Sequence, residues 1–346
     1  MATSSWNAGI IRPVPVPPAG PLATGAAPGV WTLDQVAFWQ KQGLWPVTGN
    51  FPVYGLFGGG NSSANGNVIE YINITTTGNS TDFGDLTRTM STLTAFASST
   101  RGVFGGGSIP GTGTVFNTIN YVTINTTGNA SAFGELTVAR SSLGGCSSET
   151  RGLFASGGDT SGSGNSLVID YVTIASTGNA TNFGDVTLAR FALAGCSSTT
   201  RGVFGGGFTG SFQNVIDYVT IASTGNATDF GDLTLLDYTL ASCSSSTRGI
   251  FAGGYESTTG GQDTNVISYI TIASTGNAID FGDLTVARRR LAGCSSTTRG
   301  VFAGGIGGTG VMDYITIATT GNAASFGTLL TARSALAGCS GSHGGL

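Results

Sequence analysis

Few side chains in this sequence could take part in catalysis or bind a metal. Charged residues make up 9% of the 346 residues, and the single histidine is His343. Zinc and redox sites use cysteines and histidines at short spacings such as C-x-x-C. The cysteines here lie far apart, each in a near-copy of LAGCSS: Cys146, Cys196, Cys243, Cys294 and Cys339. Phe96 replaces the cysteine once, so we expect a buried hydrophobic position and no metal or other cofactor.

A pair of carboxylates is the other arrangement that could support catalysis. Glycosidases place two acids around the scissile bond on one face of the protein. Only Glu256 and Asp263, with Asp159 in another loop, are candidates for such a pair. The stretch STDFGDLT at 80–87 loosely resembles the Asp-box of sialidases, but half of its copies lack the first aspartate. We therefore predict that the protein is not an enzyme, with a glycan-degrading enzyme as a remote alternative.

Composition also bears on partners. The formal net charge is −4 with 14 basic residues, which provides no basic surface for a nucleic acid. No apolar run approaches the roughly 18 residues of a membrane helix. The start of the chain, MATSSWNAGIIRPVPVPPAG, lacks the charged end and apolar centre of a signal peptide. We expect synthesis in a cytoplasm and neither nucleic acid nor membrane as a partner.

The chain is built on a repeat of about 50 residues. A glycine before an aliphatic–Phe pair marks each unit, at Gly55, Gly102, Gly152, Gly202, Gly249 and Gly300. Each unit contains four short β-branched or aromatic runs separated by turn residues: strand a in LAGCSS, b in RGVFAGG, c in VIDYVTI and d in FGDLT. Four strands per such period are typical of a propeller blade. We predict an all-β, six-bladed β-propeller over residues 51–346.

The two ends of the repeat region predict how the ring closes. The first unit, around 54–60, has no strand a before it, and the chain ends on an unmatched strand a at 334–342 (SALAGCSGS). The C-terminal strand is therefore expected to join the first blade. This closure would remove the exposed edges that an open array leaves.

The order of these strands resembles Kelch-type propeller repeats over residues 54–342. The matching feature is the Gly–Gly after strand b, as in Gly105–Gly106 and Gly206–Gly207. This chain has Phe where Kelch repeats usually place Trp, and its strand c tyrosine is followed by more strand and not by Asp. The resemblance implies a Kelch-like propeller.

Residues 1–50 differ from the repeats. IIRPVPVPPAGP, in which Val14 and Val16 alternate with prolines, predicts an extended polyproline-like arm. PGVWTLDQVAFWQKQGLWP predicts one short helix, because Thr32 and Gln35 form a capping box and a glycine and a proline end the pattern. The helix region carries four large aromatic residues: Trp31, Phe38, Trp39 and Trp45. They could pack under the ring or dock on another subunit, so we predict that the arm and these aromatic residues form an assembly or anchor segment.

This segment and the repeat phrase YVTIASTGNATDFGDLT together resemble structural proteins of tailed phages, in particular marine and cyanobacterial ones. The resemblance implies a non-enzymatic virion protein, such as a tail-fibre component, that contacts other virion proteins through residues 1–50 and forms a homo-oligomer in the particle. A capsid decoration or neck protein is the alternative position.

The connecting loops predict which face would bind a partner. Strands alternate in direction, so the a–b and c–d loops share one face, and the b–c and d–a loops share the other. The c–d turns repeat TGN, whereas the b–c loops differ in every blade, the pattern of a constant scaffold with variable binding loops. The candidate residues on these outward loops are Phe116, Phe208, Phe212, Tyr255 and Glu256. Their aromatic rings could stack on sugars, so a host-glycan receptor-binding module is a second hypothesis.

Charged residues also recur with the repeat. An arginine opens strand b, as in Arg151 and Arg201, and an acid follows the Phe-Gly of strand d, as in Asp185 and Asp232. Arginine pairs well with carboxylates. We therefore expect these two sets to form ion pairs that tie strands or blades together.

Overall fold

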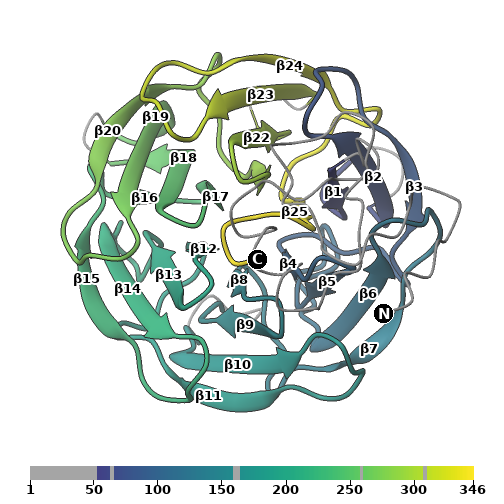
Figure 1. Ribbon diagram of the computed structural model, residues 1–346. Coiled ribbons are helices and arrows are strands. Elements are labelled where there is room, and N and C mark those ends of the chain that lie inside the picture. Colours follow the sequence, from purple (N-terminus) through teal and green to yellow (C-terminus); the bar gives the residue numbers. More distant parts are fainter. Residues whose placement is uncertain (1–52, 63–65, 159–163, 258–259, 307–309) are drawn as a thin grey trace, which may run out of the picture. The chain divides into compact units, whose positions relative to one another are not determined.

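The computed structural model describes residues 53–62, 66–158, 164–257, 260–306 and 310–346, and the arm and the helix predicted in 1–50 lie outside them. Val53–Leu346 form one compact unit. The described residues contain strands and no helix, hence no helix that could span a membrane. Six antiparallel sheets surround a common axis (Figure 1), which confirms the predicted six-bladed β-propeller.

Each blade contains the four predicted strands, and strand a lies nearest the axis. The a strands of blades 1 to 6 are β25 (Ala337–Ser340), β4 (Thr94–Ala97), β8 (Gly144–Ser147), β12 (Ala194–Ser197), β17 (Ala241–Ser244) and β21 (Ala292–Ser295). The b strands are β1 (Tyr54–Gly58), β5 (Arg101–Gly105), β9 (Arg151–Ala155), β13 (Arg201–Gly205), β18 (Arg248–Glu256) and β22 (Arg299–Ala303).

The outer two strands of each blade complete the sheet. The c strands are β2 (Val68–Asn73), β6 (Thr118–Thr123), β10 (Val168–Thr173), β14 (Val215–Thr220), β19 (Gln262–Thr271) and β23 (Val311–Thr316). The d strands are β3 (Thr81–Asp85), β7 (Ser131–Glu135), β11 (Thr181–Asp185), β15 (Thr228–Asp232), β20 (Ile279–Asp283) and β24 (Ala324–Thr328). Blade 5 has one additional short strand, β16 (Asp237–Tyr238), which pairs with β18.

The ring closes through its C-terminal strand, as predicted. β25 pairs antiparallel with β1, with Gly55 opposite Ser340 and Leu56 opposite Cys339. Blade 1 is therefore made from the two ends of the propeller unit. Because its inner strand comes from the C-terminal end, the first and last blades cannot separate without breaking a sheet.

Adjacent blades stack through glycines in strand b. A Cβ atom on Gly202 would lie 2.6 Å from the sulfur of Cys146 in the preceding blade, and one on Gly58 would lie 2.6 Å from the ring of Phe104 in the next blade. Real Cβ atoms do not approach other atoms so closely, so these positions must remain glycine. The Phe104 ring and its equivalents are buried between sheets. The hydrophobic core of the ring is thus a set of inter-blade layers.

The TGN turn connects each blade to the one before it. Asn129 Oδ1 accepts a hydrogen bond from the backbone N–H of Asp85 at 3.0 Å, and the N–H of Gly128 donates to the carbonyl of Phe83 at 2.8 Å. Gly84 has φ 146°, and a Cβ there would lie 2.4 Å from the carbonyl oxygen of Gly128. The same asparagine contact occurs in every blade, through Asn79, Asn129, Asn179, Asn226, Asn277 and Asn322. These turns therefore cover the outer edge strand of each neighbouring blade.

The predicted pairing of strand b arginines with strand d acids is wrong. Arg151 lies with its guanidinium carbon 4.5 Å from the centre of the Tyr171 ring and donates to the carbonyl of Ile221 in the next blade at 2.8 Å. The other members of the set bond the same carbonyl position: Arg101, Arg201, Arg248 and Arg299. A guanidinium can donate hydrogen bonds to a carbonyl while its flat face stacks on an aromatic ring. These two interactions hold the arginine without a carboxylate partner.

Buried ion pairs form instead between the d–a loops and strand c of the following blade. Arg190 lies 2.9 Å from Asp217, and both side chains are fully buried. Burial lowers the pKa of Arg190, and the Asp217 carboxylate opposes this shift. Equivalent pairs join Arg140 to Asp170, Arg288 to Asp313 and Arg333 to Glu70.

The two remaining blades replace both members of this pair. Blade 2 has Met90 and Asn120 at the two positions, and blade 5 has Asp237 and Ser268. In both blades the loss of the arginine is accompanied by loss of the strand c acid. An unpaired buried charge destabilises the fold, so the arginine position and the strand c acid position must change together.

The matched positions of blade 2 provide a test. Arg190→Met leaves Asp217 buried without its cation, and we expect it to lower the free energy of unfolding by about 3–5 kcal/mol. Adding Asp217→Asn should recover most of the loss, because the double variant reproduces the native Met90 and Asn120 combination. Denaturant unfolding of the two single variants and the double variant measures the coupling. Additive losses would contradict this account.

Candidate functional site

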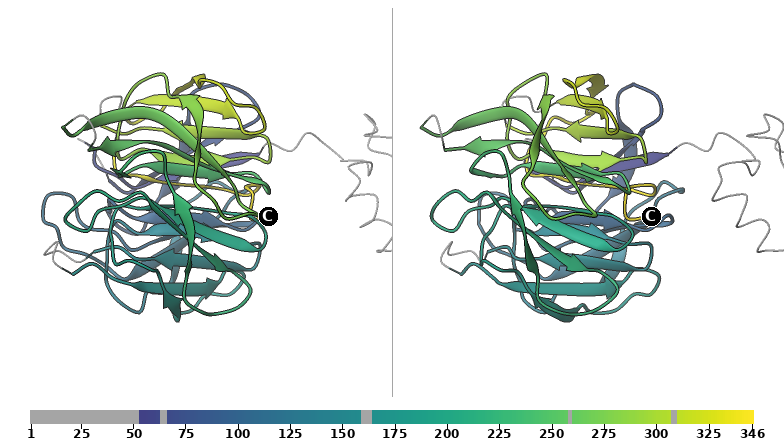
Figure 2. Two further views of the ribbon diagram at one scale, coloured as in Figure 1. Left: turned by 90° about the vertical axis from the view of Figure 1, so that its left-hand side faces the viewer. Right: turned by 60° about the vertical axis from the view of Figure 1, so that its left-hand side comes forward.

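The two faces of the ring are formed by different loops, as predicted. The c–d and a–b loops meet where the N–H of Ile124 donates to the carbonyl of Thr100, and the d–a and b–c loops meet at Ser91 and Ser108. Figure 2 shows the C-terminus on one face and the β18–β19 hairpin projecting from the opposite face. We call the face of the b–c and d–a loops the variable face.

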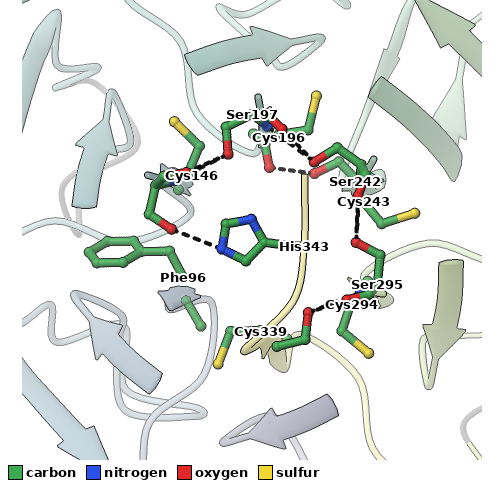
Figure 3. A pocket seen from close by; sticks show the side chains of 18 residues that line it. Phe96, Cys146, Cys196, Ser197, Ser242, Cys243, Cys294, Ser295, Cys339 and His343 are labelled. Atoms are coloured by element: carbon green, nitrogen blue, oxygen red, sulfur yellow. Dashed lines mark hydrogen bonds between the residues drawn. The ribbon is translucent and has the colours of Figure 1, made fainter. Parts of the chain in front are cut away.

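The a strands surround the axis, with cysteine and serine side chains on opposite sides of each strand. The cysteine sulfurs point away from the axis toward the next blade, whereas His343 lies at the centre (Figure 3). All five thiols are free and buried. Burial raises the pKa of Cys196 and of Cys339 to about 12. The sequence prediction that the repeated cysteine is a buried position is confirmed.

A chain of serine hydroxyls links the a strands. Ser197 Oγ donates to the carbonyl of Ser147 at 2.7 Å, and Ser147 Oγ donates to the carbonyl of Ala97 at 2.7 Å. The same bond recurs from Ser244, Ser295 and Ser340 to the serine of the preceding blade. Ala97 has no hydroxyl, so blade 2 interrupts the series.

His343 lies beside Ala97 and Ser147, at one end of the serine series. Its Nδ1 accepts the N–H of Gly345 at 3.0 Å, so Nε2 carries the proton and donates to the carbonyl of Ala97 at 3.0 Å. Burial lowers the pKa of His343, which favours this neutral form. The imidazole therefore acts as a structural hydrogen-bond donor in the channel that the six a strands surround.

A closed ring of backbone hydrogen bonds surrounds the channel mouth on the variable face. One residue of each d–a loop adopts a left-handed conformation, with φ between 54° and 61° although none is glycine: Thr92, Ser142, Ala192, Thr239, Arg290 and Ala335. Each N–H donates to the carbonyl of the equivalent residue in the preceding blade, at 2.7–2.8 Å. Left-handed backbone costs about 1–2 kcal/mol for such residues, which the backbone bonds help to offset.

A cavity of about 130 Å³ opens at this mouth. Its floor is a ring of buried leucines: Leu93, Leu143, Leu193, Leu240, Leu291 and Leu336. Its rim carries the left-handed residues described above, together with Phe191 and Tyr238. This combination of an apolar base and a polar rim is typical of a small-molecule site.

Three of the predicted binding residues come together beside the mouth. Phe208, Phe212 and Tyr255 form one patch with Phe191 and Tyr238, in which neighbouring ring centres lie 5.2–6.0 Å apart. We call these five residues the aromatic patch. Phe191 and Tyr238 were missed from the sequence because they lie in d–a loops. The sequence does contain a sign of them. Phe191 and Tyr238 occupy one position of the repeat, and in three other blades that position is a serine: Ser91, Ser141 and Ser334.

The other predicted loop residues have separate surroundings. Phe116 contacts Arg88, whose guanidinium carbon lies 4.5 Å from the ring centre, and has no ring contact with the patch among the described residues. Glu256 is buried within β18, opposite Asp237. Asp263 pairs with Arg289 at 2.6 Å, with 22% and 30% of the respective side chains exposed. Asp159 and the proposed anchor residues Val14, Val16, Trp31, Phe38, Trp39 and Trp45 lie outside the described residues.

Asp237 is an unusual buried acid beneath the aromatic patch. It takes the position that is arginine in four other blades, and its Oδ1 has no hydrogen-bond partner within the described part of the chain. Burial raises its pKa well above the usual range, and repulsion from Glu256 and Asp263 adds to this, while backbone N–H groups of Tyr238 and Tyr255 oppose it. Blade 5 thus contains a carboxyl group that favours its protonated form.

The possible metal ligands and acids of the described residues are placed as follows. The described part of the chain contains no group of three or more His, Cys, Asp or Glu side chains that could hold a metal ion. Of the acids considered for a glycosidase, Glu256 is buried and Asp263 is held by Arg289. What the variable face presents is an aromatic surface, a cavity and a polar rim, which are features of binding.

Sequence comparison adds no relative to this description. No protein family and no curated protein matches the chain.

The buried thiols lead to a direct prediction. Because the pKa of Cys196 is about 12, its thiolate fraction at about pH 8 is about a thousandfold smaller than that of a free cysteine. We expect a disulfide reagent such as DTNB to label none of the five cysteines in the folded protein and all five after unfolding in guanidinium. Thr76→Cys, at an exposed turn, is the control that should react at once. Rapid labelling of native Cys196 or Cys339 would contradict the packing.

Asp237 predicts a pH dependence. Because its folded-state pKa lies above the unfolded value, the protonated carboxyl stabilises the fold at acidic pH, and this contribution is lost as the pH rises through the folded pKa. Asp237→Asn cannot titrate, so the variant should become increasingly more stable than the native protein from about pH 4 upward. Urea unfolding at several pH values measures the difference. A difference independent of pH would show that the Asp237 carboxyl has the same pKa in the folded and unfolded states, which would contradict the prediction.

Proposed function

We propose that this protein is a non-enzymatic structural component of a phage virion. Residues 1–50 anchor it to other virion proteins, and the variable face points outward. One observation carries the proposal: the loops of one face repeat in every blade and the b–c loops of the other face differ. The face with the TGN turns repeats the same inter-blade bonds in all six blades, whereas the opposite face holds the residues that differ from blade to blade.

The Kelch-like type of the propeller belongs to the same proposal. The glycines that follow strand b support it: Gly105 of the predicted pair ends β5, and Gly106 (φ 67°) and Gly107 (102°) after it have positive φ, as do Gly206 (70°) and Gly207 (118°). A Cβ on Gly106 would lie 2.7 Å from the carbonyl oxygen of Arg140, so the turn brings the b–c loop against the d–a loop that leaves the same blade. This close approach holds the variable loops at a fixed place.

A second function, recognition of a host surface glycan, is favoured by the aromatic patch. Its five rings are each partly exposed, and they lie around blades 4 and 5. Aromatic faces on a surface can stack on the C–H faces of sugars, and their burial against one another keeps the rings rigid. Such a function is compatible with a structural role in the same particle.

The location can be tested with phage particles. We expect a version that lacks residues 1–50 to be absent from purified particles, while a full-length Phe208→Ala/Phe212→Ala variant is still incorporated. Mass spectrometry of the particles measures incorporation, and thermal unfolding of both purified variants checks that the ring is folded.

Two results would sink this proposal. One is normal incorporation of the truncated ring. The other is a density map of the assembled particle in which the b–c loops are buried against the shell and the TGN turns face outward.

A further inference from the structure

Arg290 stands apart from the other arginines of the ring. Every other arginine in the described ranges has an ion pair, a hydrogen bond from its side chain or an aromatic partner. Arg290 has none of these among the described residues, and it is exposed. In a chain with so few basic residues, a free guanidinium at a cavity is a distinct chemical feature.

The position of Arg290 is fixed by the ring of backbone bonds. Its N–H donates to the carbonyl of Thr239, and its carbonyl accepts the N–H of Ala335. Its φ of 58° is close to that of the equivalent residues in the other d–a loops, all of them small: Thr92, Ser142, Ala192, Thr239 and Ala335. Of the described residues that line the mouth cavity, Arg290 is therefore the one that places a charge on its rim.

The groups around Arg290 define the rest of the cavity. Phe191 and Tyr238 belong both to the cavity wall and to the aromatic patch, so the two surfaces are continuous. Thr92 and Thr239 donate their hydroxyl protons to the carbonyls of Ser91 and Tyr238 at 2.6 Å, and Thr92 Oγ1 accepts from Ser108 Oγ at 3.0 Å. Because a hydroxyl oxygen has two lone pairs, both threonine oxygens can still accept a hydrogen bond. The floor below is apolar.

We propose that the mouth cavity binds a sugar that carries a carboxylate, such as a uronic acid. The carboxylate pairs with the guanidinium of Arg290, which can form two parallel hydrogen bonds to it. The sugar ring lies against Phe191 and Tyr238, and its hydroxyl groups donate to the threonine oxygens on the rim. An acidic peptide would also satisfy Arg290, but the hydroxyl acceptors and aromatic walls favour a saccharide.

This inference deepens the second function proposed above and rests on the variable face being the recognition face. It does not depend on where the protein sits in a particle. Binding by the purified protein in solution therefore tests it separately from the virion location.

The experiment is a titration of the full-length protein with methyl β-D-glucuronide, with methyl β-D-glucoside as the uncharged match, followed by saturation-transfer NMR. We expect the glucuronide to bind more tightly than the glucoside and its affinity to fall as salt rises. Arg290→Gln should weaken glucuronide binding about tenfold or more and remove the preference, because a charge-assisted bond is lost. Tyr238→Leu should weaken both sugars.

Arg88→Gln is the matched control, since it removes an arginine from another d–a loop and leaves the cavity intact. It should bind like the native protein. Absence of glucuronide binding, equal binding of the two sugars, or unchanged binding in Arg290→Gln would overturn the proposal. Displacement of the glucuronide by a tetraglutamate peptide at lower concentration than the sugar itself would assign the cavity to acidic peptides instead.

Discussion

The close approach of adjacent blades is the constraint on which the rest of this structure depends. The sulfur of Cys146, or the larger ring of Phe96, fills the space where a side chain on the strand b glycine of the next blade would be. Because every blade meets its neighbour in this way, a larger side chain at any of these glycines would push two blades apart at that contact. The serine hydroxyls near the axis and the TGN turns at the rim reinforce the same contact from both sides. The stability of the ring is therefore an inter-blade property.

This constraint explains why one face is uniform and the other is free to vary. The TGN turn must reach strand d of the preceding blade, so neither its asparagine nor the strand d glycine that it contacts, such as Gly84, can change without disturbing that edge. The b–c loops contact the d–a loops through backbone groups at their first residues, as at Ser108 and Ser91, and these bonds do not depend on the side chain. Their residues can therefore change without loss of the ring, and the chain places its aromatic patch and its free arginine on that face.

Blades 2 and 5 depart most from the six-fold repeat, and in each the replaced residues change together. In blade 2, Met90 and Asn120 replace an ion pair with a neutral pair, and Ala97, which lacks the serine hydroxyl, has its carbonyl bonded by His343. In blade 5, Asp237 and Ser268 replace the same pair, and the hairpin of β18 and β19 is longer than its equivalents. The aromatic patch, Asp237 and Arg290 all lie around this blade. Its loss of the repeated arginine coincides with the surface that we assign to ligand binding.

The sequence by itself determined the fold, because a repeat of fixed length with four strand patterns permits little except a closed ring of blades. The unmatched strand 334–342 and the missing first strand also determined how the ring closes, and the LAGCSS repeat identified the buried cysteines. Tertiary structure alone decided the partners of the charged residues. The strand b arginines bond carbonyls of the next blade and lie on the strand c tyrosines of their own blade, and the acids of strand c bond arginines from the preceding loop. These contacts join residues brought together by strand pairing and blade stacking, so spacing along the chain could not reveal them. For the same reason, Phe208 and Tyr255 could be named from the loops, whereas Phe191, Tyr238 and Arg290 required the three-dimensional arrangement of the d–a loops around the channel mouth.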